Sequence, residues 1–465
     1  MSDCSGLRIT RGQWGHGVVP TTSAGSGGEP RTPHRISDGT GAPPRGPRKV
    51  AAWHAGRMRS PTGFWRTGPR AGWSHSRVTP TTPLVPPGRA ATIARELTTR
   101  IRQLTGQRVD LDGAQLLAER AALTGHTRRG RVSAGGSCRL LPTADGWAAV
   151  SCARPDDRLL LGALAETELP ADPWPNLAVW VREHTGDELA ERAELLGVAA
   201  APLRHDPVTR ALPSYPARSM DGVLVVDFSA LWAGPLCAHI LGLAGARVVK
   251  VETPTRPDGA RRGNSHFYRL LHAGHRSVVL DPSSRLGREA MAALVERADI
   301  VIEASRPRAL AGFGLDARAA VAAGTTWISI TAAGRASGRV GFGDDVAAAA
   351  GLVALDATGA PVFCGDAVAD PLTGLTAAVH ALTAPPDASG VLWDIAMADV
   401  VAATLDAAPS QPAPAARPAR GTWVIETPCG PVPVRAPRRR EAAGAAPDSG
   451  ENTAEVLAEL GIPLS

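Results

Sequence analysis

Asp370 is the residue whose type and position best fit covalent chemistry. It lies in the segment PVFCGDAVADPLTGLTAAVHAL, where Pro371 suits the first position of a helix, so the pattern predicts Asp370 as the N-cap. Helix-end amides would keep the carboxylate ionised, and the apolar residues 361–364 lead into a position where α/β sheets bind ligands. An ionised carboxylate there can attack an acyl carbon, although the same pattern also fits an aspartate that only caps a helix.

A second candidate segment is the turn from Ser229 to Pro235, with the sequence SALWAGP. Ala233 and Gly234 would let a ligand approach the backbone closely, and Pro235 suits the first position of a helix. Free N–H groups at that helix start could hold an anion such as a phosphate, but the turn fits equally well a tight connection without a ligand. Because the segment lacks the pattern G-x-G-x-x-G, it does not predict a nicotinamide dinucleotide site.

Other polar residues give weaker signals. Asp344 and Asp345, in GFGDDVAAAAGL, either include a catalytic base or cap the following helix. Ser229 lacks the G-x-S-x-G pattern of an α/β-hydrolase nucleophile. The six cysteines include no Cys-x-x-Cys pair and no histidine cluster has zinc spacing, so the sequence predicts no metal site.

A parallel sheet is expected to position these residues. Apolar runs without polar alternation cover residues 223–226, 247–251, 277–280, 299–303 and 327–331, and helical segments separate them. Such runs indicate strands that are covered on both faces. The expected fold class is therefore α/β, with a Rossmann-like parallel-sheet domain over residues 220–465.

A smaller α/β domain is expected over residues 89–205. Residues 93–104 have the spacing of an amphipathic helix, and CRLLPTADGWAAVSC predicts two short strands joined at Asp145 and Gly146. The proline-containing residues 206–219 are expected to form a linker between the two domains.

Residues 1–88 are expected to be a disordered basic extension, because they are rich in Gly, Pro, Ser, Thr and Arg and have no helical or strand period. Residues 1–90 carry 13 Arg or Lys and 3 Asp or Glu, so the positive net charge of the chain arises there. The rest of the chain is mildly acidic and does not predict a nucleic-acid partner. No secretory signal and no apolar run of ~18–20 residues is present, so we expect a cytoplasmic protein without a membrane partner.

Several segments resemble class III CoA-transferases, the CaiB/BaiF family. Residues 222–254, GVLVVDFSALWAGPLCAHILGLAGARVVKVETP, are similar to the opening signature of that family. HAGHRSVVLD, ADIVIEASRPRALAGFGL, VADPLTGLTAA and GENTAEVLAELGI resemble later family segments in the same order. The segments ADGWAAV and RAELLGVAAAPL resemble the small domain of the family, which usually follows the sheet domain and here precedes it.

The resemblance implies a CoA-transferase in which Asp370 is the catalytic residue. Its carboxylate would attack a donor acyl-CoA, form a mixed anhydride, take up CoA as an aspartyl-CoA thioester and pass it to an acceptor carboxylic acid. The resemblance also implies a homodimer, with CoA thioesters as substrates and no tightly bound cofactor. It places these residues along CoA: Trp232, Ala233, Gly234 and Pro235 at the turn, and His275, Arg276 and Arg306 at the nucleotide end.

Two alternatives remain open on the sequence. A racemase or isomerase of the same family would use Asp344 or Asp345 as one base and Asp370 as the other, although family racemases carry a histidine where this chain has Asp344. A catalytically weak CoA-binding protein is the second alternative, because the domain order is changed and the segments around His275 and Arg306 depart from the family pattern.

Overall fold

The computed structural model describes residues 88–206, 215–356, 358–405, 416–419, 422–427 and 430–463. The predicted extension, residues 1–88, lies outside this part of the chain except for Gly88, and so do residues 207–214 of the predicted linker. Gly88 is the first residue of helix α1 (Gly88–Leu104), which confirms the predicted amphipathic helix.

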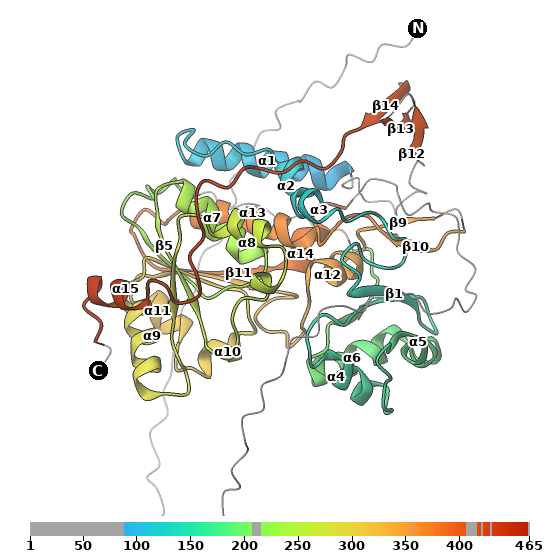
Figure 1. The fold of residues 1–465 in the computed structure, drawn as a ribbon, viewed down its shortest axis with the longest axis horizontal. Helices are drawn as coiled ribbons and strands as arrows, with labels where there is room; N and C mark the ends of the chain where they lie inside the picture. Colours follow the sequence, from blue (N-terminus) through green and yellow to red (C-terminus); the bar gives the residue numbers. More distant parts are fainter. Residues whose placement is uncertain are drawn as a thin grey trace, which may run out of the picture. The chain divides into compact units, whose positions relative to one another are not determined.

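A six-stranded parallel sheet forms the centre of the sheet domain (Figure 1), with the strand order β11-β8-β7-β4-β5-β6. In chain order the strands are β4 (Leu224–Asp227), β5 (Arg247–Glu252), β6 (Arg276–Val279), β7 (Ile300–Glu303), β8 (Thr326–Thr331) and β11 (Val391–Ala396). The five strands predicted from the sequence are confirmed with small shifts at their ends, and so is the α/β fold class.

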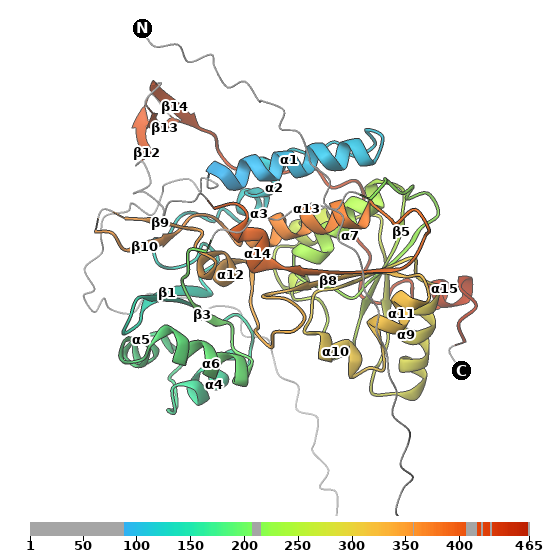
Figure 2. The same cartoon turned by 180° about the vertical axis from the view of Figure 1, so that it is seen from behind.

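Helices cover both faces of this sheet (Figures 1 and 2). One core joins strand residues such as Val225 and Ile300 to the helices α1, α7 (Ala233–Leu243), α8 (Ser265–His272), α13 (Ala369–Ala381) and α14 (Met397–Ala402). The other core joins Val226 and Val301 to the helices α9 (Arg285–Arg297), α10 (Pro307–Ala311), α11 (Ala317–Ala322) and α15 (Thr453–Glu459). Successive strand residues point to opposite faces, so strands covered on both sides must be apolar throughout.

A three-stranded antiparallel sheet and three helices form a separate small core. Its elements are β1 (Cys138–Pro142), β2 (Trp147–Ser151), β3 (Ala200–Pro202), α4 (Asp157–Leu164), α5 (Trp174–Glu183) and α6 (Gly186–Leu196). β1 and β2 form the predicted hairpin, and the connection between them contains Asp145 and Gly146. Thr185 and Glu188 form a capping box at the start of α6.

The first helices of the described chain pack on the sheet domain. Ala94, Leu97 and Ile101 of α1 are buried in the same core as α13. The short helices α2 (Gly113–Leu116) and α3 (Glu119–Thr124) follow. The helix that the sequence prediction grouped with residues 89–205 therefore has its buried stripe in a core of the large parallel sheet.

Two further groups of elements connect these layers. Helix α12 (Gly343–Ala349), β9 (Val353–Leu355) and β10 (Pro361–Phe363) lead from β8 to α13, and the 3₁₀ helix η1 (Gly259–Arg262) leads from β5 to α8. Near the C-terminal end, β12 (Ala416–Ala419), β13 (Thr422–Thr427) and β14 (Gly430–Val434) form an antiparallel sheet of their own.

The first residue of α15 and the residues before it lie along β6, the edge strand of the large sheet. The Gly450 N–H donates to Ser277 Oγ over 3.0 Å, and the Ser277 N–H donates to Asn452 Oδ1 over 3.0 Å. The Val279 N–H donates to Thr453 Oγ1 over 3.1 Å. Polar groups on the outer side of β6 therefore have partners in residues 450–453.

Candidate active site

A groove of about 240 Å³ opens at the carboxyl ends of the central strands. Its lining includes residues that follow β4, β7 and β8, together with Arg154 from the small domain. Parallel α/β sheets bind ligands at this position. Three residues that the sequence predicted in functional roles, Ala233, Arg306 and Asp370, line this groove together.

Asp370 lies in the first turn of α13, and the prediction that it is the N-cap is wrong. The helix begins at Ala369, and Val368 holds the N-cap position without a side-chain hydrogen bond. The preceding Ala367 has a φ of +49°, and its carbonyl accepts a hydrogen bond from the Asp370 N–H over 3.0 Å. A left-handed conformation strains a residue that has a side chain, and such strain is concentrated at functional sites.

The helix amides do not hold the pKa of the Asp370 carboxyl below its usual value, contrary to the prediction. Burial raises the pKa of Asp370 to about 7. The positive charge of Arg120 opposes this rise, whereas the negative charges of Asp344, Asp345 and Asp366 add to it. A carboxylate surrounded by other carboxylates holds its proton more tightly than one at an isolated helix end.

Asp344 and Asp345 start α12 and bind backbone groups. Asp345 Oδ1 accepts hydrogen bonds from the Phe342 N–H (2.9 Å) and from the hydroxyl of Ser151 in β2 (2.8 Å). Asp344 Oδ1 accepts the Ala367 N–H over 2.8 Å. Burial raises the pKa of both carboxyls to about 6. Neither residue lines the groove, and Asp345 has the contacts of a helix cap.

Asp366 and Arg120 form a partly buried ion pair that no sequence pattern predicted. Arg120 Nε donates to Asp366 Oδ2 over 2.9 Å, and Arg120 Nη2 donates to the other oxygen. His126 Nδ1 lies 3.4 Å from Asp366 Oδ2. Burial alone would raise the pKa of Asp366. The charge and hydrogen bonds of the Arg120 guanidinium have the larger effect and hold the pKa of that carboxyl well below its usual range. The two partners are far apart in the chain and belong to no local motif, so no sequence signal would have paired them.

Arginines give the groove a positive lining: Arg154, Arg256, Arg306 and Arg339. Burial lowers the pKa of Arg306, and the charges of neighbouring arginines lower it further. In Arg339, Nε and Nη2 are buried without a hydrogen-bond partner among the described residues. Guanidinium donors in this setting suit an anionic ligand.

The turn between β4 and α7 lines the groove only in part. Ala230, Leu231 and Ala233 line it. Trp232 is buried, and its ring meets the Phe267 ring edge-on with centroids 5.1 Å apart. The other two residues predicted along CoA in this turn, Gly234 and Pro235, are buried within the first turn of α7 and do not line the groove.

His275 and Arg276 lie away from the groove. His275 is buried beside His239 and His272, with ring centroids 6.2 and 5.4 Å apart, and burial lowers the pKa of His275 to about 3. Arg276 begins β6 and forms an ion pair with Glu459 of α15. The structure therefore does not bring these two residues together with the other candidate site residues.

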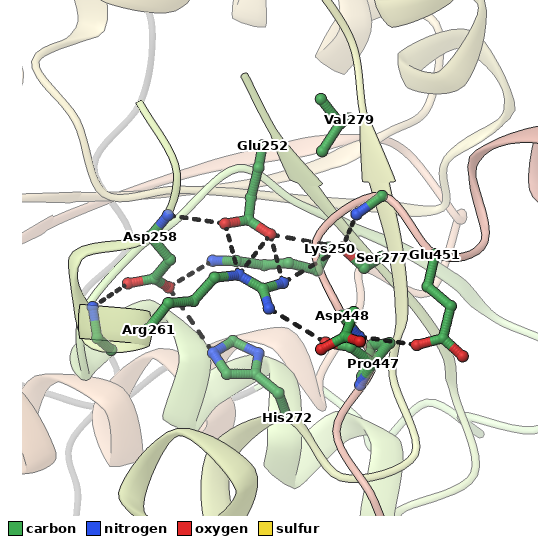
Figure 3. Close-up of polar contacts among 12 residues, drawn as sticks. Lys250, Glu252, Asp258, Arg261, His272, Ser277, Val279, Pro447, Asp448 and Glu451 are labelled. Carbon is green, nitrogen blue, oxygen red and sulfur yellow. Dashed lines mark hydrogen bonds and ion pairs between the residues drawn. The ribbon is translucent and has the colours of Figure 1, made fainter. Parts of the chain in front are cut away.

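A buried network of charges lies behind the turn that lines the groove. Lys250 Nζ lies 3.0 Å from Asp258 Oδ2 and 3.7 Å from Asp227 Oδ2. Figure 3 marks the contact with Asp258 by a dashed line. Burial disfavours the charge on Lys250, but the two carboxylates outweigh it and raise the pKa of Lys250. Lys250 also donates to the Ser229 carbonyl, and Asp258 Oδ1 accepts the Leu231 N–H over 2.9 Å. Leu231 has a φ of +71°, so the network holds a strained residue of the groove in place.

The same network extends to the edge of the sheet. Glu252 accepts hydrogen bonds from Arg261 Nη2 (2.6 Å) and from the Asp258 N–H (2.7 Å). Arg261 Nη1 also donates to the Pro447 carbonyl over 3.1 Å (Figure 3). The loop after β5 is thereby tied to the segment that leads into α15.

The described residues contain neither a metal-binding group nor a membrane-spanning helix. In that part of the chain, no group of three or more His, Cys, Asp or Glu side chains is arranged to hold a metal ion. Among the helices that the structure describes, none combines the length and apolar character needed to cross a membrane. The described cysteines at positions 138, 152, 237 and 364 are free thiols.

Residues 220–422 match the model of CoA-transferase family III, so the resemblance predicted from the sequence is confirmed for this region. Succinyl-CoA–D-citramalate CoA-transferase of Chloroflexus aurantiacus is 31% identical over 185 residues, which cover 36% of this chain and 46% of that protein. Formyl-CoA:oxalate CoA-transferase of Afipia carboxidovorans is 31% identical over 105 residues, which cover 21% and 25% of the two chains. The chain thus matches less than half the length of these curated relatives. A solved structure of a CAIB/BAIF family protein from Brucella suis shares 25% identity, with 46% of this chain and 65% of that chain covered and a TM-score of 0.39.

Proposed function

Residues 220–422 belong to CoA-transferase family III, and we propose that this protein moves CoA from an acyl-CoA donor to a carboxylic acid acceptor. The observation that carries the proposal is that Asp370 lines a groove with four arginines at the carboxyl end of the sheet. A carboxylate can take up an acyl group. Guanidinium groups can bind the phosphates of CoA and the carboxylate of the acceptor.

The first half of the reaction charges the enzyme with CoA. An oxygen of the ionised Asp370 carboxylate attacks the carbonyl carbon of the donor thioester, the C–S bond breaks, and CoA leaves as a thiolate. The product is a mixed anhydride between Asp370 and the donor acyl group. The thiolate then attacks the aspartyl carbonyl, so that Asp370 becomes the aspartyl-CoA thioester and the donor acid is released as a carboxylate.

The second half reverses these steps with the acceptor. The acceptor carboxylate attacks the aspartyl-CoA carbonyl and expels the CoA thiolate, which forms a second mixed anhydride. The thiolate attacks the acceptor acyl carbon, the new acyl-CoA forms, and Asp370 returns to a free carboxylate. No tightly bound cofactor takes part, because each step uses only the carboxylate and the two substrates.

A rise of activity with pH is expected from Asp370. The attack needs the ionised carboxylate, and burial raises the pKa of Asp370 to about 7, so the protonated form predominates below that pH. We therefore expect kcat/KM to rise through about pH 7 and to level off above it. Initial rates from about pH 5.5 to about pH 8.5, with residual activity checked at each pH, measure this. A profile that is flat or falls over this range would contradict the assignment.

Gly343, the first residue of α12, leaves space for the Asp370 carboxylate. A Cβ at this position would meet Asp370 Oδ2 and would lie 2.7 Å from the carbonyl oxygen of Ala367. We expect Gly343→Ala to lower kcat by up to about a hundredfold, because a reacting group displaced by about 1 Å loses activity on that scale. Gly146→Ala is the control, since a Cβ there has no neighbour closer than 3.9 Å. Equal kcat values for the two variants would be inconsistent with this role of Gly343.

The transfer itself is tested with acyl-CoA labelled in its CoA portion and a panel of mono- and dicarboxylic acids. Formation of a new labelled acyl-CoA that depends on the added acid supports the proposal. Hydroxylamine added during turnover should convert the aspartyl-CoA thioester into a hydroxamate at Asp370, which peptide mass mapping locates. If no acid gives a new acyl-CoA, the proposed function fails.

The racemase alternative predicts a different product. It would exchange the α-proton of an acyl-CoA for deuterium in heavy water without an acceptor acid. Asp344 and Asp345 do not line the groove. Among the described residues, Asp370 is therefore the only aspartate in the lining that could take a proton from the substrate. Deuterium uptake without CoA transfer would favour the alternative, and CoA binding without either reaction would indicate a CoA-binding protein.

We also propose that the protein is a homodimer in the cytoplasm, as the sequence predicts. Light scattering during gel filtration tests the dimer, and a mass of about 48 kDa would contradict it, since the chain has a mass of 48.1 kDa. Fractionation of the source cells tests the location.

A further inference from the structure

The turn that leads into Asp370 is held at two successive residues. Ala367 is in the left-handed conformation, with a φ of +49°. Its N–H donates to Asp344 Oδ1 over 2.8 Å, and the Asp366 side chain just before it is held by Arg120. A strained turn persists only where its surroundings fix it, so both contacts matter for the place of Asp370.

Arg120 reaches this turn from α3, which precedes the region that matches the family. Its guanidinium forms two hydrogen bonds with Asp366, whose side chain is 1% exposed. The guanidinium also lies over the Trp232 ring, 5.2 Å from the ring centroid. Arg120 thus contacts both turns that border the groove, the one after β4 and the one before α13.

A second ion pair, separate from the Arg120 contacts, involves the helix that carries Arg120. The neighbouring residue, Glu119, is fully buried and accepts hydrogen bonds from Arg440 Nε and Nη2, each over 2.8 Å. Adjacent residues of α3 are therefore tied to two different parts of the chain.

We propose that Arg120 is a positioning residue for Asp370, supplied by a segment outside the region that matches the family. It acts by holding Asp366 and thereby the strained turn that presents the Asp370 carboxylate to the groove. It also places a fixed positive charge within the carboxylate cluster, which favours the ionised form of Asp370. This inference rests on the proposed function of Asp370 as the nucleophile.

Arg120→Gln and Arg120→Lys test the inference in CoA transfer. We expect Arg120→Gln to lower kcat by about a hundredfold with KM for acyl-CoA within about threefold, because the nucleophile is displaced and not the CoA site. The acid limb of the kcat/KM profile should move to higher pH, since a charge that favours ionised Asp370 is lost. Arg120→Lys keeps the charge and should recover part of both losses.

Arg440→Gln is the matched control, because it breaks an ion pair of the same kind on the adjacent residue Glu119. It is expected to lower the melting temperature without moving the acid limb of the pH profile. If Arg120→Gln lowers only the melting temperature, or if the pH profiles of the two variants coincide, Arg120 is structural and the inference is overturned.

Titration of Asp370 without turnover separates this inference from the proposed function. Infrared or ¹³C NMR difference spectra between each protein and its Asp370→Asn variant follow the ionisation of this carboxyl directly. A higher pKa of Asp370 in Arg120→Gln supports the inference even if wild-type protein transfers no CoA. An unchanged pKa in a protein that does transfer CoA would overturn the inference and leave the proposed function standing.

Discussion

Replacement of Asp370 with asparagine is expected to abolish CoA transfer, with a loss of at least about a thousandfold in kcat. An amide of nearly the same shape cannot attack a thioester and cannot form the anhydride or the aspartyl-CoA thioester. The groove and its arginine lining stay in place in this variant, so the acyl-CoA should still bind. Transfer rates with labelled acyl-CoA, and binding by calorimetry, measure the two parts separately.

Two controls accompany the measurements on Asp370→Asn. The melting temperature of Asp370→Asn must lie within a few degrees of the wild-type value. Burial already raises the pKa of the Asp370 carboxyl to about 7, so a neutral amide is expected to be tolerated at this buried position. Hydroxylamine should give no hydroxamate at position 370. A variant that keeps more than about one tenth of the transfer rate would refute the role of Asp370 as nucleophile.

Replacement of Lys250 with methionine is expected to lower the free energy of unfolding by about 3–5 kcal/mol. Lys250 Nζ lies near the buried carboxylates of Asp258 and Asp227, and its removal leaves both without this cation. His272 Nε2 lies 3.7 Å from Asp258, but burial and the charge of Lys250 lower the pKa of His272 well below its usual value, so in the wild-type protein Lys250 and not His272 supplies the positive charge.

Urea unfolding of Lys250→Met and wild type measures this difference. Arg285→Gln is the control, because Arg285 and Glu289 form an exposed ion pair with 75% and 55% of their side chains accessible. That variant should differ from wild type by less than about 1 kcal/mol. A Lys250→Met protein with an equally small difference would show that the buried network does not stabilise the fold.

The sheet could be predicted from the sequence, because residues such as Val225 and Val226 face opposite cores and both must be apolar. The first residue of α13 was predicted less accurately than the strands. A proline fits at any position of the first helical turn, because the backbone N–H groups of that turn have no partner within the helix. Pro371 therefore does not mark the first residue of α13. The helix begins two residues before Pro371, and Asp370 falls inside it.

The electrostatics of the site could not be predicted from local patterns. The segment around Asp370 shows a helix start, which favours an ionised carboxylate. Asp344 and Arg120 come to the same place from distant segments, and burial adds a larger effect that no motif reports. His275 matched a family segment, yet its side chain is buried beside His239, because where a residue packs depends on the tertiary fold.

The contacts along β6 also limit what can pair with this edge of the sheet. An uncovered outer strand of a parallel sheet exposes a row of amide and carbonyl groups to which a strand of another molecule can add. Here Asn452 and Thr453 accept hydrogen bonds from the outer side of that strand. Asn452 and the first residue of α15 thus occupy edge groups that would otherwise be open to pairing with a strand of another molecule.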